Sequence, residues 1–127
     1  MGSQKILVVE DFEDLRSLIT VYLSARGYEV LEAPTGRAAI ETAITGNPNF
    51  ILLDLRLPDV SGVEVARELR KLPQTEHIPI VGWTADCGSK PYEEVLRRAG
   101  IIDCLEKPVS MRELEAVIQR FVPTPQG

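Results

Sequence analysis

The sequence predicts one α/β domain in which a parallel sheet carries helices on both faces. A length of 127 residues suits a single domain. Strand-like and helix-like patterns alternate five times along the chain, and this order is typical of parallel sheets. Residues 6–9 and 50–53 are apolar at every position, as strands buried on both faces are. These observations together define the fold class.

Five short segments have the character of strands. Residues 28–32 alternate polar and apolar side chains, which favours an edge position in the sheet. Residues 50–53 form the most apolar run, which favours a central position. The predicted strands cover residues 5–10, 28–32, 50–53, 78–83 and 101–105.

Five further segments, which alternate with the strands, have apolar residues at the spacing typical of a helix. In the first, Leu15, Leu18, Ile19 and Tyr22 fall on one face, and Gly27 follows where a C-terminal glycine is expected. Two later helices begin with a capping box, a serine followed three residues on by glutamate. The predicted helices cover residues 12–26, 35–45, 61–71, 89–99 and 111 up to Pro123.

The composition excludes several classes of protein. A hydrophobic content of 44% and a charged content of 26% are ordinary for a globular domain. The net charge of −5 argues against direct nucleic-acid binding, which needs clustered Lys and Arg. No apolar run approaches the ~20 residues of a membrane span, and the first residues lack the apolar run of a signal peptide. We therefore expect a cytoplasmic protein with no membrane or nucleic-acid partner.

The chain has two cysteines, Cys87 and Cys104. Their spacing matches no zinc motif, and nothing else in the sequence indicates an oxidising compartment. We predict that both are reduced thiols and that Cys104 is a small core residue.

Unusual polar residues stand at the ends of four predicted strands. Glu10 and Asp11 end the first strand, Asp54 ends the third, Thr84 follows the fourth and Lys107 follows the fifth. The carboxyl ends of parallel strands meet at one edge of the sheet, where ligands of open α/β folds bind. The sequence therefore predicts a site at this edge.

The charges of this site predict its chemistry. Each pair of carboxylates at 4 Å repels by about 4 kcal/mol at an effective dielectric constant near 20, so a cation should be present. Lys107 is one candidate, and an all-oxygen cluster favours Mg²⁺ as another. An aspartate beside Mg²⁺ is a competent nucleophile toward a phosphoryl group. Lys107 and Thr84 would then contact the phosphoryl oxygens.

The motifs at these positions resemble the receiver domain of two-component response regulators. The matching stretches are residues 6–11, residues 53–58, Thr84-Ala85 and Lys107-Pro108, and the resemblance covers about residues 5 to 121. It implies a flavodoxin-like, five-stranded parallel sheet in the order 2-1-3-4-5. Residues 1–4 and 122–127 would be flexible tails.

The resemblance also implies a role for each site residue. Asp54 would accept a phosphoryl group from a sensor histidine kinase or a phosphotransfer protein, without the domain being a turnover enzyme. Asp11 would bind Mg²⁺ directly, Glu10 directly or through water, and the backbone carbonyl of Arg56 would complete the metal site. Thr84 would move toward the phosphoryl group and Lys107 would pair with it. The Lys107–Pro108 bond is usually cis in the family.

Two positions depart from the family pattern. Cys104 stands where an aromatic switch residue is usual, and Ile102 stands where an acid is common. The apolar Ile102 suggests that the face of the fourth helix, fifth strand and fifth helix meets a downstream protein target or a second copy. Arg56 and Asp86 should border the mouth of the pocket, and an ion pair between them would shield the phosphoryl group from water.

Three other functions are less consistent with these residues than a receiver. A flavin-binding domain needs a phosphate-cradling loop after the first strand, where residues 10–14 carry four carboxylates. An Asp-dependent phosphatase resembles Asp54-Leu55 but needs a second Asp where this chain has Arg56. A degenerate receiver, acting by protein contact without phosphorylation, would lack one of the site residues, and all are present. Whether the chain acts alone or belongs to a longer regulator stays open.

Overall fold

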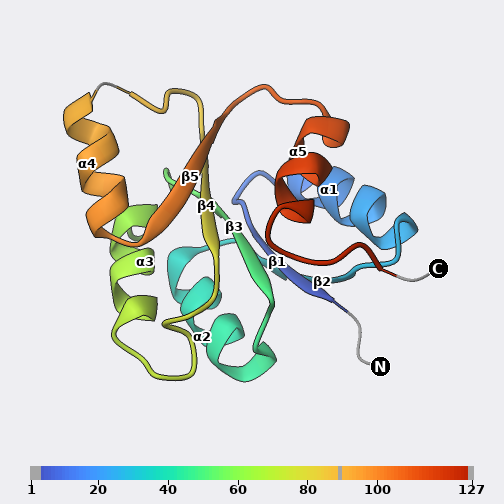
Figure 1. Ribbon diagram of the computed structural model, residues 1–127, viewed down its shortest axis with the longest axis horizontal. Coiled ribbons are helices and arrows are strands. Elements are labelled where there is room, and N and C mark those ends of the chain that lie inside the picture. The colour runs from blue at the N-terminus through green and yellow to red at the C-terminus, as the bar shows by residue number, and fades with distance from the viewer. Residues whose placement is uncertain (1–3, 89, 126–127) are drawn as a thin grey trace.

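The computed structural model describes residues 4–88 and 90–125, in which strands and helices alternate five times (Figure 1). The strands are β1 (Lys5–Val9), β2 (Glu29–Ala33), β3 (Phe50–Asp54), β4 (Ile80–Thr84) and β5 (Ile101–Glu106). The helices are α1 (Glu13–Ala25), α2 (Gly36–Gly46), α3 (Gly62–Arg70), α4 (Lys90–Arg98) and α5 (Met111–Gln119).

All strand pairs of the sheet are parallel, and the strand order is β2-β1-β3-β4-β5. Figure 1 shows α1 and α5 on one side of the sheet and α2, α3 and α4 on the other. The predicted fold class and strand order are confirmed. β3 lies in the centre, as its uninterrupted apolar run predicts.

Two apolar clusters hold the layers together, one on each face of the sheet. Alternate residues of each central strand point to opposite faces. Leu52 therefore packs with α1 and α5, whereas Leu53 packs with α2, α3 and α4. Complete burial of such a side chain contributes about 1.5–3 kcal/mol.

Local sequence signals set the helix ends. Gly27 has φ +99°, a conformation that strains other residues, and it ends the turn after α1. The Ser61 hydroxyl accepts a hydrogen bond from the Glu64 N–H at the start of α3. Ser110 forms the full reciprocal capping box with Glu113. The predicted start of the fourth helix at Ser89 lies outside the described residues.

The packed face of α1 differs from its prediction. Leu15 and Tyr22 pack against the core and Ile19 is fully buried, as expected, but Leu18 is 55% exposed. Leu23, which lies four residues after Ile19, takes the inward position instead. The apolar stripe of α1 is therefore rotated relative to the predicted face.

Val122, which follows α5, packs on the domain. The Val122 side chain is buried in the α1–α5 layer, and its N–H donates to the Ile118 carbonyl at 2.9 Å. Of the tails predicted as flexible, residues 1–3 and 126–127 lie outside the described residues. Within the described part of the chain, no helix is long and apolar enough to cross a membrane.

The prediction of two reduced thiols is wrong. Cys87, in the loop after β4, forms a disulfide with Cys104 in β5, and their Cα atoms lie 6.1 Å apart. The two residues meet because β4 and β5 are neighbours and Cys104 pairs with Gly82. Spacing along the sequence alone could not bring a loop residue and a strand residue together. Cys104 is consequently half-buried and cross-linked rather than a free core thiol.

A buried carboxylate joins the first helix to the last. Glu115 of α5 is 5% exposed and accepts hydrogen bonds from the Tyr22 hydroxyl at 2.8 Å and from Arg26 Nε at 2.9 Å. Burial by itself would raise the pKa of Glu115, but the bonds from Arg26 and Tyr22 outweigh it and lower the pKa. The carboxylate is therefore held in its charged form between α1 and α5.

We expect Glu115→Ala to lower the free energy of unfolding by about 1–3 kcal/mol at pH 7, because hydrogen bonds to a charged group contribute about that much. The pKa of Glu115 is lowered on folding from its ordinary value of 4.5. Its stabilising contribution is therefore present above that value and is lost as the pH falls through the lowered pKa. Urea unfolding of both proteins at pH 7 and at pH 3 measures the difference.

The matched control is Glu29→Ala, which removes an exposed carboxylate from β2 and should change stability by less than about 0.5 kcal/mol. Equal losses in the two variants would contradict a structural role for the Glu115 contacts.

Candidate functional site

The parallel register gathers the predicted polar residues at one edge of the sheet. Asp54 is the last residue of β3 and Thr84 the last of β4. Glu10 follows β1 directly, and Lys107 follows β5 directly. Val9 pairs with Leu53 across β1 and β3, so the residues that follow them lie at the same level. The predicted meeting of these side chains is therefore seen in the structure.

Lys107 lies between two buried carboxylates. Its Nζ donates to Glu10 Oε1 at 2.9 Å and to Asp54 Oδ2 at 3.2 Å. Glu10 is 2% exposed and Asp54 is 3% exposed, so little water reaches either of them. Charges that are removed from water need a paired counter-charge, and Lys107 supplies it.

Three further donors fix Glu10. The Phe12 N–H donates to Oε2 at 3.1 Å, and the Trp83 indole Nε1–H donates to Oε1 at 3.0 Å. Arg16 donates to the Glu10 backbone carbonyl at 2.9 Å. Burial alone would raise the pKa of Glu10, but the bonds from Lys107 and Phe12 outweigh it and lower the pKa. Glu10 is therefore held as a carboxylate in a fixed orientation.

The pKa of Asp54 is shifted in the opposite direction to that of Glu10. Burial raises its pKa to about 6, and the negative charge of Glu10 adds to this, against the opposing effects of the Arg56 N–H and Lys107. The Arg56 N–H donates to Asp54 Oδ1 at 2.8 Å. A Cβ at Gly62 would come within 2.6 Å of the Asp54 carbonyl oxygen, so only glycine lets α3 begin this close to the site. Asp54 is thus desolvated and short of positive charge.

The same carboxylates form a candidate metal centre. Oxygen atoms of Glu10, Asp11 and Asp54 lie within 4.8 Å of one another, and Asp11 is exposed to solvent. An all-oxygen donor set with one open side fits Mg²⁺, which keeps several waters in its coordination shell. Three carboxylates lie around the single ammonium group of Lys107, so the cluster keeps a net negative charge. The residues present therefore fit a divalent cation.

Thr84 and Lys107 are also linked through the backbone. The Lys107 N–H donates to the Thr84 carbonyl at 2.7 Å, and the Thr84 side chain is buried. The Lys107–Pro108 bond is cis, as the resemblance implies. The ends of β4 and β5 are therefore hydrogen-bonded to each other at the site.

The two residues predicted at the mouth do not pair. Arg56 is exposed, and Asp86 accepts a hydrogen bond from the Gly88 N–H at 2.8 Å. Across residues 4–88 and 90–125, the structure has no ion pair between Arg56 and Asp86. Asp86 is turned into its own loop, since the short side chain caps the backbone two residues on.

Sequence reasoning missed one functional contact. Trp83 is absent from the predicted site, but its indole nitrogen donates to Glu10 and its ring centroid lies 5.4 Å from Lys107 Nζ. The available signal was a tryptophan one residue before Thr84, on a strand that ends at the site. A buried Trp N–H usually finds an acceptor, and here the end of β1, two strands away in the sheet, supplies a carboxylate.

Comparison with known proteins agrees with this geometry. The response regulator receiver domain family matches residues 6–119. The polar-differentiation response regulator DivK of Brucella ovis is 32% identical over 120 residues, covering 94% of this chain and 97% of that protein. The phosphate regulon transcriptional regulatory protein PhoB of Pseudomonas aeruginosa is 38% identical over 127 residues, covering 97% of this chain but 55% of that protein.

Solved structures give the same result. Chemotaxis protein CheY4 of Vibrio cholerae superposes with a TM-score of 0.89 at 28% identity, covering 94% of this chain and 99% of that one. The receiver domain of a sensor histidine kinase from Pseudomonas aeruginosa superposes with a TM-score of 0.84 at 33% identity, covering 94% and 98%. That receiver holds a magnesium ion in its active site cleft.

The chain therefore belongs to the response regulator receiver domain family. It is a signalling module of two-component systems, and its acidic cluster fits the magnesium site of such a domain.

We expect Trp83→Phe to weaken Mg²⁺ binding about tenfold, because outer-shell partners that orient a ligand typically contribute 10–100-fold to metal affinity. The variant loses the N–H that holds Glu10 and keeps an aromatic ring in the core. Isothermal titration calorimetry measures the affinity without relying on tryptophan emission. Trp83 emission of the parent protein should also change when Mg²⁺ is added.

The control is Tyr22→Phe, which removes a hydrogen bond to a different buried carboxylate, Glu115, in the α1–α5 layer. Its Mg²⁺ affinity should equal that of the parent. An unaltered affinity in Trp83→Phe would show that Trp83 only packs.

Proposed function

We propose that Asp54 accepts a phosphoryl group from a sensor histidine kinase or a phosphotransfer protein in a Mg²⁺-dependent reaction. The observation that carries this proposal is the placement of Asp54, a desolvated carboxylate between Lys107 Nζ and the other two acids. A nucleophile needs a free lone pair and a neighbouring positive charge for the group it attacks. Asp54 has both.

In the reaction, a carboxylate oxygen of Asp54 forms a bond to phosphorus while the bond from phosphorus to the donor histidine nitrogen breaks. The nitrogen keeps the electron pair of the broken bond. A pKa of about 6 leaves Asp54 largely ionised at pH 7 and therefore able to attack. When bound, Mg²⁺ would neutralise charge on the phosphoryl oxygens.

Lys107 then changes partner. Its Nζ is shared between Glu10 and Asp54 in the present structure. Conversion of Asp54 to an acyl phosphate would move negative charge outward, and the ammonium would follow it to the phosphoryl oxygens. Thr84, at the end of the neighbouring strand, would donate its hydroxyl to another of these oxygens. The metal ligands we propose are Glu10, Asp11, Asp54 and the Arg56 carbonyl.

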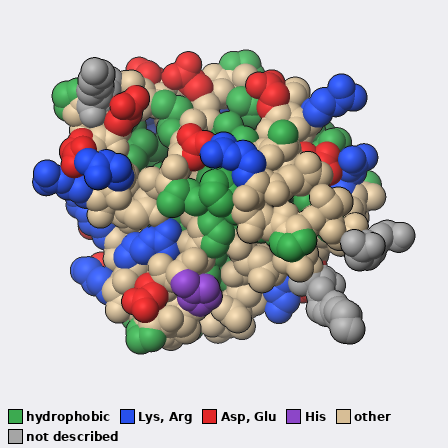
Figure 2. Space-filling view, viewed as in Figure 1, with side chains coloured by type: hydrophobic (Ala, Val, Ile, Leu, Met, Phe, Trp, Pro, Cys, Tyr) green, Lys and Arg blue, Asp and Glu red, His purple; other side chains and the backbone are tan. Residues whose placement is uncertain are grey.

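We further propose that the surface formed by α4, β5 and α5 transmits the signal to a downstream protein or a second copy. Figure 2, viewed as Figure 1, shows hydrophobic side chains near the middle of this face. Ile102 of β5 is 49% exposed and Val95 of α4 is 38% exposed, which gives a partner apolar surface to cover. We propose that the reaction takes place in the cytoplasm, the location expected from the sequence.

Incubation with Mg²⁺ and acetyl phosphate should add one phosphoryl mass to the protein, and Asp54→Asn should abolish the addition. Asp14→Asn, which alters an exposed aspartate in the first turn of α1, is the matched control and should be phosphorylated like the parent. Intact-mass spectrometry measures both.

A parent protein that gains no mass would favour the degenerate receiver that acts by contact alone. Size-exclusion chromatography of the same samples tests whether the α4–β5–α5 surface binds a second copy of the chain. A monomer with and without phosphorylation would refute that version of the proposal.

We keep Arg56 as a residue proposed to control water access to the phosphoryl group, and the role predicted for its ion pair with Asp86 is withdrawn. Because no ion pair joins them, Arg56 would have to act alone, through its exposed side chain beside the mouth. We expect Arg56→Ala to speed dephosphorylation, as followed by the decay of the phosphorylated mass. A rate equal to that of the parent would dismiss the role.

A further inference from the structure

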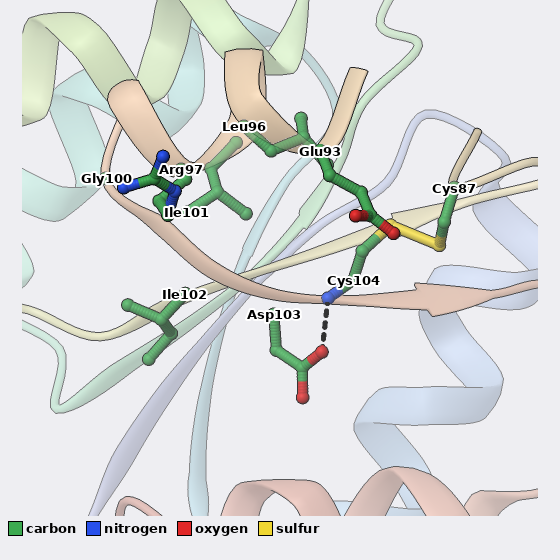
Figure 3. Close-up of a pocket in the computed structure, with 9 residues that line it drawn as sticks. All are labelled: Cys87, Glu93, Leu96, Arg97, Gly100, Ile101, Ile102, Asp103 and Cys104. Carbon is green, nitrogen blue, oxygen red and sulfur yellow. Dashed lines mark hydrogen bonds between the residues drawn. A yellow bond between two sulfur atoms is a disulfide. The ribbon is translucent and has the colours of Figure 1, made fainter. Parts of the chain in front are cut away.

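The Cys87–Cys104 disulfide lies beside the moving parts of the proposed switch. Cys87 comes three residues after Thr84, and Cys104 comes three residues before Lys107. The Cys87 N–H also donates to the Glu106 carboxylate at 3.1 Å. Figure 3 shows the bond joining the loop after β4 to β5. One covalent link thus connects the chain segments that carry two of the proposed phosphoryl-binding side chains.

We propose that this cysteine pair is a thiol–disulfide exchange site, taking low-molecular-weight thiols or dithiols, whose redox state controls how readily the domain is phosphorylated. The proposal rests on the proposed function, since it concerns the movement of Thr84 toward a phosphoryl group on Asp54. In the oxidised protein the loop after β4 is tied to β5. In the reduced protein the loop is free to follow Thr84.

A small thiol can reach the bond. Cys87 and Cys104 are both half-buried and line an open surface hollow of about 490 Å³ between α4 and β5. Glu93 and Arg97 of α4 contribute charged side chains to its rim, and Leu96 and Ile101 contribute apolar ones (Figure 3). A disulfide that opens onto such a hollow is accessible to exchange, unlike one sealed in a core.

The exchange reaction needs no reactant other than the small thiol. A thiolate of the small molecule attacks one sulfur of the pair, forming a mixed disulfide and releasing the other cysteine as a thiolate. A second thiol then attacks the mixed disulfide. Two small thiols are oxidised to their disulfide while Cys87 and Cys104 are reduced, and two protons pass to the cysteine sulfurs. The reverse reaction with a small disulfide restores the bond.

The disulfide restrains the proposed switch because it closes a loop in the chain. The bond closes a segment with a sequence separation of 17 residues that includes all of α4. Closing such a loop removes conformations that the open chain could visit. Glu10, Asp11 and Asp54 belong to or follow β1 and β3, which the bond does not join, so metal binding should not depend on the bond. Disulfides in the cytoplasm, where we place the domain, are usually transient and redox-sensing.

The test compares two redox states of the complete chain. One sample is kept oxidised with glutathione disulfide and the other is reduced with dithiothreitol, and iodoacetamide labelling with intact mass verifies each state. Both are incubated with Mg²⁺ and acetyl phosphate. The reduced protein should be phosphorylated at least about fivefold faster, the lower end of typical coupling between sites. Mg²⁺ affinity, followed by Trp83 emission, should be equal in the two states.

The control variants lack the bond in every condition. Cys87→Ser/Cys104→Ser should be phosphorylated at the rate of the reduced parent, with or without dithiothreitol. Cys87→Ser alone changes only a loop residue and should behave in the same way, which guards against misfolding of the double variant. Equal rates in the two redox states of the parent would overturn the proposal, as would cysteines that iodoacetamide labels before reduction.

Failure of the proposed function gives a different pattern. In that case no phosphoryl mass appears in either redox state. Amide hydrogen exchange in the loop after β4 then tests, independently of phosphorylation, whether the disulfide restrains the loop. Slower exchange in the oxidised protein would support the constraint on the loop, and equal exchange would overturn it.

Discussion

The contact of Lys107 with Glu10 and Asp54 is the interaction on which this domain depends. Two carboxylates that water barely reaches are held together by a single ammonium group. The charge balance is incomplete, since a third carboxylate, that of Asp11, lies in the same cluster. A site with this unpaired negative charge favours a divalent cation and leaves an aspartate ready to react.

The rest of the fold serves to hold that contact in place. Parallel pairing brings the ends of β1, β3, β4 and β5 to one edge, and helices on both faces keep water from the strands. Donors from outside the ion cluster then orient its members. Trp83 and Phe12 fix Glu10, and the Arg56 N–H fixes Asp54. The precision of the site therefore comes from neutral donors as much as from charges.

The sequence predicted those parts of the molecule that depend on periodicity and on strand ends. Asp54 and Lys107 could be placed because every parallel strand delivers its last residue to the same edge. Contacts between side chains from different elements could not be placed. The Trp83 bond to Glu10 and the Cys87 link to Cys104 depend on register and loop path, which no local pattern encodes. Leu18 was misplaced because Leu18 and Leu23 flank the packed face of α1 on opposite sides, and a rotation of less than one residue exchanges them.

The incomplete charge balance at the cluster of Glu10, Asp11 and Asp54 has a consequence for handling the protein. A ligand that binds only the folded state adds stability in proportion to the logarithm of its concentration. Magnesium bound by these acids would therefore stabilise the folded protein, and chelators such as EDTA would remove this stabilisation. Melting temperatures of variants are then comparable only when the free magnesium concentration is the same in every sample.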